Sequence, residues 1–163
     1  MTEDEIKKYF TDEIKKMSDS QELSVDRCLD ELKKTYDGYR FHPAGVNVYN
    51  PYSILNALSD CEFGSYWFET GTPSYLTKRI KENRFDLRKL TDGTLYANEN
   101  ILKDYIGENP DPVPLLFQTG YLTISDYDKR LKRYTLCFPN EEVKYAFLES
   151  LMPSYVPEST KEN

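Results

Sequence analysis

The sequence predicts an α+β fold that is mainly helical, with a helical subdomain carrying a small β-hairpin followed by a winged-helix-like unit. Apolar residues repeat at helical spacing over much of its 163 residues. β-branched and aromatic residues flank two short turns, which is typical of hairpins. We expect the helical subdomain over residues 1–108, the winged-helix-like unit over 109–152 and a flexible polar tail over 153–163.

Two helices are expected before the first turn. Thr2 and Glu5 have the spacing of a capping box, and apolar residues then recur at helical intervals to about Met17. A polar connector follows, and a second amphipathic pattern runs over residues 25–36. That pattern ends at Asp37-Gly38, a dipeptide typical of turns because glycine tolerates a positive φ.

The hairpin is expected directly after this turn. Arg40 and Phe41 precede a Pro/Gly reversal at residues 42–45, and residues 46–49 supply the returning strand. Asn50 then has the position of a helix N-cap and Pro51 that of the first helical residue. A helix is therefore predicted from Pro51 to about Leu58.

The middle of the chain is less regular. Residues 61–69 are rich in aromatic rings, and residues 70–73 supply a turn, an N-cap threonine and a proline for an amphipathic helix. Between residues 85 and 105 the apolar residues are spaced among Asp, Asn and Gly, which indicates short helices and extended pieces.

The end of the chain has the element order of a winged helix. A short apolar helix over residues 113–119 ends at Gly120, the residue expected just after its C-terminus. Strands follow over 121–125 and 133–138, joined by a polar turn. Asn140 then caps a last helix with acids in its first turn, where they suit the helix dipole.

Composition excludes several classes of function. The net charge is −7, which disfavours diffuse attraction to nucleic acid. No apolar run approaches the roughly 20 residues that span a bilayer, so we expect no membrane association. The cysteines Cys28, Cys61 and Cys137 form no CxxC pair, which favours a reducing compartment and a cytoplasmic location.

The chain offers few groups for catalysis. It contains neither GxxxxGK[ST] nor GxGxxG, so we expect no nucleotide or other cofactor in this segment and no enzymatic activity. His42 is the only histidine, which excludes a multi-histidine metal site; we predict no metal centre. Arg40 either clamps locally, by pairing with Asp37 or stacking on Tyr39, or reaches a phosphate or a partner carboxylate.

Two further groups are candidates for contacts. Glu69 follows Trp67 and Phe68, whose rings could desolvate it, although it could equally cap a local backbone N–H. Basic residues concentrate in the predicted turn between the two strands, where a winged helix can lie along a nucleic-acid backbone, although a solvated tip explains them as well. They are Lys129, Arg130, Lys132 and Arg133.

Four stretches resemble, in the same order, the C-terminal part of the bacterial AAA-ATPase-like proteins. They are residues 36–41 (YDGYRF), 48–55 (VYNPYSIL), 66–71 (YWFETG) and 116–123 (LFQTGYLT). In that family a P-loop ATPase core precedes this region, and many members carry a PD-(D/E)XK-type nuclease domain after it. The Walker segments are missing here, so we expect this chain to be a segment of a longer protein.

The resemblance implies a non-catalytic lid and interaction segment that packs on a nucleotide-binding core of the same polypeptide, with ATP bound only by the full-length protein. Arg40, Tyr39 and Glu69 are then the residues expected nearest to a nucleotide or a partner. The residues expected to shape the motifs are Tyr36, Asp37, Gly38, Phe41, Asn50, Pro51, Trp67, Gly71 and Gly120.

Overall fold

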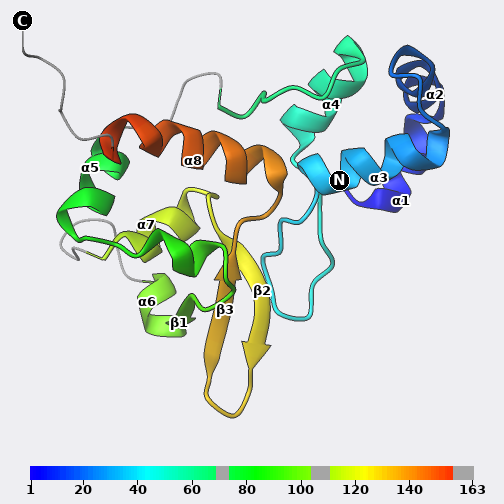
Figure 1. Cartoon of the computed structure of the whole chain (residues 1–163). Coiled ribbons are helices and arrows are strands. Elements are labelled where there is room, and N and C mark those ends of the chain that lie inside the picture. Colours follow the sequence, from blue (N-terminus) through cyan, green and yellow to red (C-terminus); the bar gives the residue numbers. More distant parts are fainter. Residues whose placement is uncertain (69–73, 104–110, 156–163) are drawn as a thin grey trace, which may run out of the picture.

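Four helices at the beginning of the chain surround one hydrophobic cluster and form a first lobe (Figure 1). The computed structural model describes residues 1–68, 74–103 and 111–155. The helices are α1 (Glu3–Tyr9), α2 (Thr11–Ser20), α3 (Val25–Tyr36) and α4 (Pro51–Asp60). The cluster comprises Ile6, Ile14, Met17, Cys28, Leu32, Tyr36, Tyr49, Ile54, Ala57, Leu58 and Cys61.

The helix starts agree with the capping signals. Thr2 accepts a hydrogen bond from the Glu5 N–H at 3.3 Å, and the Glu5 carboxylate accepts one from the Thr2 N–H at 2.8 Å. Asn50 Oδ1 accepts from the N–H groups of Tyr52 and Ser53. The predicted first helix is broken, however, because Phe10 leaves the helical region at φ −123° and ψ 30°.

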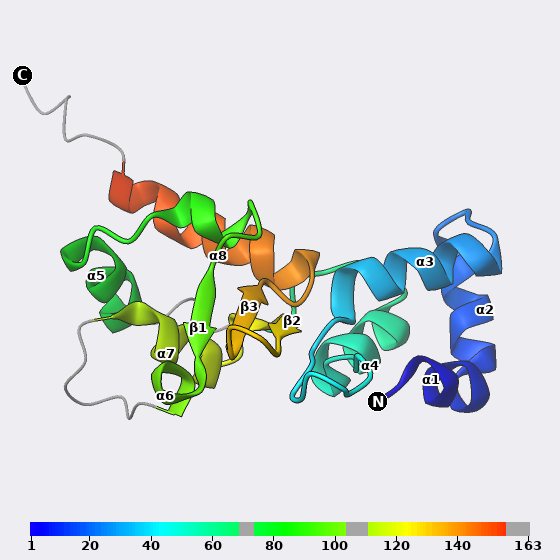
Figure 2. The ribbon, with the colours of Figure 1, turned by 90° about the horizontal axis from the view of Figure 1, so that it is seen from below.

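The second lobe contains the sheet and the remaining helices of the described residues (Figure 2). Its elements are α5 (Ser74–Glu82), the 3₁₀ helix η1 (Leu87–Leu90), β1 (Tyr96–Asn98), α6 (Glu99–Lys103), α7 (Pro112–Gln118), β2 (Thr123–Asp128), β3 (Arg133–Cys137) and α8 (Glu141–Tyr155). The strands form an antiparallel sheet in the order β1-β3-β2. Helix α8 crosses above the sheet in Figure 1.

The α+β fold class is confirmed, and so is the predicted order of helix, strand, strand and helix from α7 to α8. Strand β1 is a third strand of this sheet. It pairs with β3, so that Tyr96 lies opposite Thr135. The sequence indicated only extended pieces there, because three residues carry no visible alternation. The predicted N-cap and proline before α5 fall on residues 70–73, outside the described residues.

The hydrophobic clusters divide the chain earlier than the predicted boundary at 108/109. The second cluster already includes Leu76 and Ile80 of α5, which pack with core residues such as Leu116 and Leu136. The division therefore falls between Cys61 and Leu76, since α5, β1 and α6 cover the same core as the sheet. Helix α8 extends to Tyr155, into the predicted tail, and residues 156–163 lie outside the described part of the chain.

The predicted hairpin over residues 40–49 is reduced to one bridging pair, Tyr39 with Val48. Their backbones exchange two hydrogen bonds of 3.2 and 2.9 Å, and the turn is closed by Gly45 N–H on the His42 carbonyl. The ladder ends at this pair, and the Arg40 N–H, which points away from the Val48 segment, donates to Thr123 Oγ1 at 2.7 Å. The loop is thus attached to the sheet of the second lobe.

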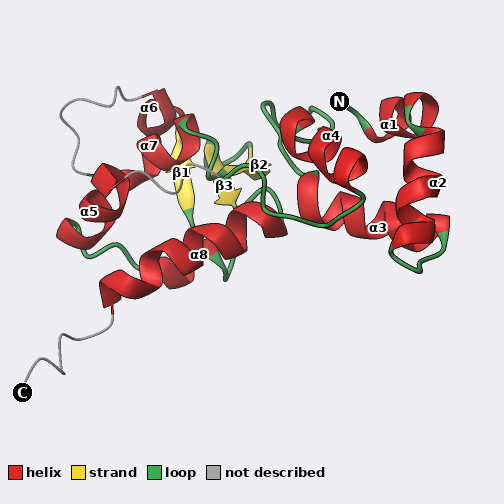
Figure 3. Cartoon of the chain, turned by 90° about the horizontal axis from the view of Figure 1, so that it is seen from above, coloured by secondary structure: helices red, strands yellow, loops and turns green. Residues whose placement is uncertain are grey.

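The lobes meet where the Asp37-Gly38 turn contacts the chain before α8 (Figure 3). Gly38 has φ +103°, and a Cβ on it would lie 1.8 Å from the Pro139 carbonyl oxygen. Asn140 Nδ2 donates to the Asp37 carbonyl at 3.0 Å, while its Oδ1 accepts from the Val143 N–H and caps α8. Only glycine allows both this φ and this approach.

Within the described residues, no helix has the length and apolar character needed to cross a membrane.

Replacing Gly38 with Ala should destabilise the protein by about 3 kcal/mol, because the new methyl group meets backbone and the residue must keep a left-handed φ. Gly93→Ala is the matched control: Gly93 has φ +74°, and a Cβ there would have nothing within 4 Å, so the cost should be about 1 kcal/mol. Urea denaturation measures both, and equal losses would contradict the close contact at Pro139.

Candidate binding pocket between the lobes

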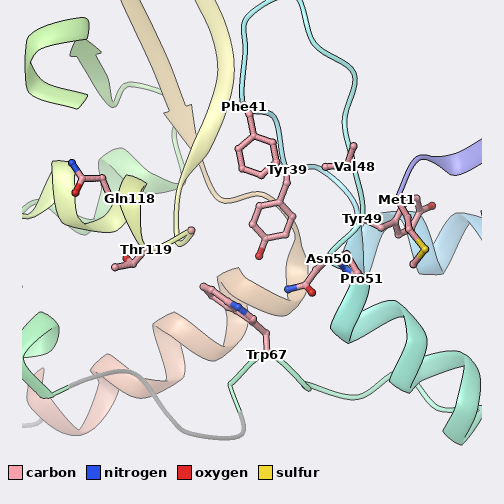
Figure 4. A pocket seen from close by; sticks show the side chains of 11 residues that line it. Met1, Tyr39, Phe41, Val48, Tyr49, Asn50, Pro51, Trp67, Gln118 and Thr119 are labelled. Atoms are coloured by element: carbon pink, nitrogen blue, oxygen red, sulfur yellow. The ribbon is translucent and has the colours of Figure 1, made fainter. Parts of the chain in front are cut away.

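All four motif stretches contribute to one pocket between the lobes (Figure 4). Its volume is about 490 Å³. The lining residues are Met1, Tyr39, Phe41, Val48, Tyr49, Asn50, Pro51, Trp67, Gln118, Thr119 and Gly120. Stretches that lie far apart in the chain therefore share one surface, and ligand pockets commonly form at such junctions.

Aromatic rings and one glycine shape the wall of the pocket. Gly120 follows α7, as predicted, with φ +84°. A Cβ on Gly120 would lie 3.5 Å from the Trp67 ring and 3.9 Å from the Tyr39 ring. The Trp67 ring also packs edge-on against Tyr121, with 5.1 Å between ring centroids. The Tyr39 and Trp67 rings thus both lie beside a residue without a side chain.

Tyr39 is held between the two lobes. Its ring packs against the second cluster, and Figure 4 shows its hydroxyl directed toward Asn50 and Trp67. Burial is the main cause that raises the pKa of Tyr39, and the neighbouring Asn50 side chain opposes it. The hydroxyl makes no hydrogen bond of ordinary geometry with the described residues.

Arg40 binds backbone carbonyls. Its Nε donates to the Gly45 carbonyl and its Nη1 to the Ser125 carbonyl, both at 3.0 Å. Thr123 Oγ1 in turn donates to the Arg40 carbonyl at 3.0 Å. The side chain is therefore a local clamp that joins the loop to β2, with partners other than Asp37. Its contact with a nucleotide or a partner stays a prediction.

Tyr36 and Asp37 are buried at the junction. The Tyr36 hydroxyl donates to the Gly64 carbonyl at 2.8 Å. Asp37 is 5% exposed, and its Oδ1 has no hydrogen-bond partner in the described part of the chain. Burial raises the pKa of Asp37, although a hydrogen bond from the Gly38 N–H lowers it in part. Both residues fix the turn instead of facing the pocket.

Glu142 is a buried carboxylate for which the sequence predicted only an interaction with the helix dipole. It is 5% exposed, and its Oε1 accepts hydrogen bonds from Tyr66 N–H (2.8 Å), Trp67 N–H (2.7 Å) and Ser53 Oγ (3.1 Å). Burial, the largest cause, raises its pKa, and these hydrogen bonds act against it. Glu142 therefore positions Trp67 in the pocket wall.

The only sequence signal for the role of Glu142 is its position at the start of α8. The partners of Glu142 lie 75 to 89 residues away in the chain, so the signal does not reveal them. Trp67, predicted to shape a motif, lines the pocket. Glu69 and Gly71, also predicted, lie outside the described residues.

The basic residues occupy the turn between β2 and β3, which projects from the second lobe (Figure 1). Lys129, Arg130 and Lys132 are exposed, and the Asp128 carboxylate accepts hydrogen bonds from Arg130 N–H and Leu131 N–H. Arg133 lies apart from this group, since its guanidinium stacks 4.0 Å above the Tyr96 ring. Nucleic-acid contact by this turn stays a prediction.

The described residues that line the pocket include no His, Cys, Asp or Glu. Among the described residues, no group of three or more His, Cys, Asp or Glu side chains could hold a metal ion. The thiols of Cys28, Cys61 and Cys137 are free, and burial raises the pKa of Cys28 and Cys137.

Comparison with known proteins found a bacterial relative of this chain. No family model matches the chain, and no solved structure matches it. The chain is 37% identical over 131 residues to an Azotobacter chroococcum mcd 1 protein described as "Uncharacterized protein in vnfD 5'region". The match covers 79% of this chain and 25% of that relative, so the chain spans about a quarter of the relative's length.

Replacing Glu142 with Gln should change how stability depends on pH. Because burial raises the Glu142 pKa above its ordinary value of 4.5, the folded protein keeps the proton where the unfolded chain has lost it. The stability of the native protein relative to the variant should therefore fall as pH rises above 4.5.

Urea denaturation at several pH values measures this difference. Glu141→Gln is the control, because the Glu141 carboxylate is half-exposed and pairs with Lys34 at 3.3 Å. A native protein that becomes more stable relative to Glu142→Gln as pH rises would refute the assignment.

Proposed function

We propose that this chain is a non-catalytic lid and interaction segment of an AAA-ATPase-like protein, and that it packs on a nucleotide-binding core outside this chain. The observation that supports the proposal best is a clamped loop with exposed apolar side chains, over residues 38–50. Phe41 is 80% exposed and Val46 is 72% exposed on this loop. Apolar side chains displayed on an ordered loop are typical of contact surfaces.

The loop is ordered before any partner arrives. Arg40 ties it to Gly45 within the loop and to Ser125 on β2, and Thr123 exchanges two hydrogen bonds with the Arg40 backbone. The pair Tyr39 and Val48 closes its base. A surface held in this way loses little conformational entropy on binding, which favours association.

The length of the relative supports a larger context. A match to a quarter of a longer protein fits a segment that works with other domains of the same polypeptide, including the expected ATPase core and a nuclease domain. The proposal includes ATP binding by the full-length protein only and a cytoplasmic location, which the three free thiols favour. The residues encoded upstream of Met1 should contain the motif GxxxxGK[ST], and the absence of this motif there would refute the proposal.

Substitution of both Phe41 and Val46 with Ser should weaken binding of this chain to the separately produced ATPase core by at least about tenfold, because the exposed apolar contact is lost. Isothermal titration calorimetry measures the affinity. Tyr9→Ser is the control, since Tyr9 is 66% exposed on α1 at the far end of the first lobe. Equal binding by the double variant and the native chain would contradict docking through this loop.

A second candidate is binding to a nucleic-acid backbone by the β2–β3 turn. The observation that favours it is the exposure of Lys129, Arg130 and Lys132 on a projecting hairpin. Such cations can neutralise phosphates without reading bases. The net charge of −7 acts against it, so we rank it below the first proposal.

If this candidate is right, binding to a fluorescein-labelled DNA duplex should weaken with salt, with log affinity against log salt having a slope of about −3 for three phosphate contacts. Replacing Lys129 and Arg130 with Gln should bring the slope to about −1. Fluorescence anisotropy measures both. The control replaces Lys15 and Lys16 of α2 with Gln, and an identical slope in both double variants would remove the candidate.

A further inference from the structure

The pocket between the lobes has a lining that selects for an uncharged group. Among the described residues that line it, the side chains are aromatic, aliphatic, thioether, amide or hydroxyl, and none carries a charge. Burying an unpaired charge against such a lining is costly, so phosphate, carboxylate and ammonium groups are disfavoured inside it. Its volume of about 490 Å³ falls in the range of small-molecule sites.

The shape of the lining favours a flat ring. Tyr39 and Phe41 approach from the loop of the first lobe, and Trp67 approaches from the connector between the lobes (Figure 4). Gly120 leaves the space beside the Tyr39 and Trp67 rings free of a side chain. Aromatic rings prefer stacked or edge-on partners, and this arrangement offers both kinds of surface to a planar ligand.

The Asn50 amide is placed to form a hydrogen bond with the edge of such a ring. Asn50 Oδ1 is occupied as the cap of α4, by Tyr52 N–H at 3.0 Å and Ser53 N–H at 3.3 Å. These bonds fix the amide, so its Nδ2 is left as the donor on the side of the Tyr39 hydroxyl, as Figure 4 shows. An NH₂ donor in an apolar pocket favours a ligand with a carbonyl or ring-nitrogen acceptor.

We propose that this pocket binds a small, uncharged heteroaromatic compound, whose ring packs against Tyr39, Phe41 and Trp67 and whose acceptor takes a hydrogen bond from Asn50. The ligand contacts both lobes, so its binding stabilises their junction. All the lining residues described above belong to this chain, so binding of this ligand is tested on this chain alone and separately from the proposed lid function.

Trp67 provides the measurement, because it is the only tryptophan in the sequence and it lines the pocket. The probes are nicotinamide, uracil and hypoxanthine, each with a ring and a carbonyl acceptor, titrated into the whole chain. We expect at least one to change Trp67 fluorescence saturably, with a dissociation constant below about 1 mM, and to raise the melting temperature. No saturable change with any of the three overturns the proposal.

Asn50→Asp tests the role of the amide. Aspartate keeps the capping oxygen of α4 but loses the NH₂ donor and adds a negative charge, so affinity for the bound probe should fall at least about tenfold. Asn56→Asp is the matched control: Asn56 lies in α4, the helix that Asn50 caps, donates to the Tyr52 carbonyl at 2.8 Å and is not among the described lining residues. Equal loss in both variants, or no loss in Asn50→Asp, overturns the proposed contact.

A peptide probe separates this proposal from protein docking. N-acetylphenylalaninamide carries an aromatic side chain on a peptide backbone. The proposal requires it to bind more weakly than the best heteroaromatic probe, because its ring edge has no acceptor for Asn50. Tighter binding of the peptide probe would identify the pocket as a receptor for a partner's side chain and overturn the small-molecule assignment.

Discussion

The close approach of the Gly38 backbone to Pro139 is the contact on which the arrangement of the two lobes depends. It brings the end of α3 against the start of α8, and Asn140 then joins the Asp37 carbonyl to the cap of α8. From this turn the chain enters the loop that carries Tyr39 into the pocket and Arg40 onto β2. A side chain at Gly38 would separate these elements, because backbone cannot move aside as a flexible side chain can.

Glu142 stabilises the same junction from the other side. Its carboxylate accepts hydrogen bonds from the Tyr66 and Trp67 N–H groups of the connector and from the Ser53 hydroxyl of α4. Removal of a carboxylate from water is costly, and three hydrogen bonds to one oxygen offset part of that cost. Burial is the largest cause of the raised pKa of Glu142, and the three hydrogen bonds act against it. The position of Trp67 thus depends on a balance between burial and hydrogen bonding.

Local signals in the sequence predicted the elements that depend on near neighbours. The Thr2 capping box, the Asn50 cap with Pro51, and Gly120 after α7 all involve groups within a few residues of one another. Strand β1 and the break at Phe10 were not visible, because a three-residue strand and a single non-helical residue leave no periodic pattern. The clamp of Arg40 on Ser125 was equally invisible, since its partner is a carbonyl 85 residues away.

The sequence by itself determined the α+β class, the order of helices and strands near the end of the chain, and the identity of the unusual motif residues. Only the tertiary structure decided that those motifs line one pocket, that the cores divide between Cys61 and Leu76, and that Glu142 positions Trp67. The physical reason is range: capping and periodicity act over a few residues, whereas a pocket is formed by side chains that burial brings together from distant parts of the chain.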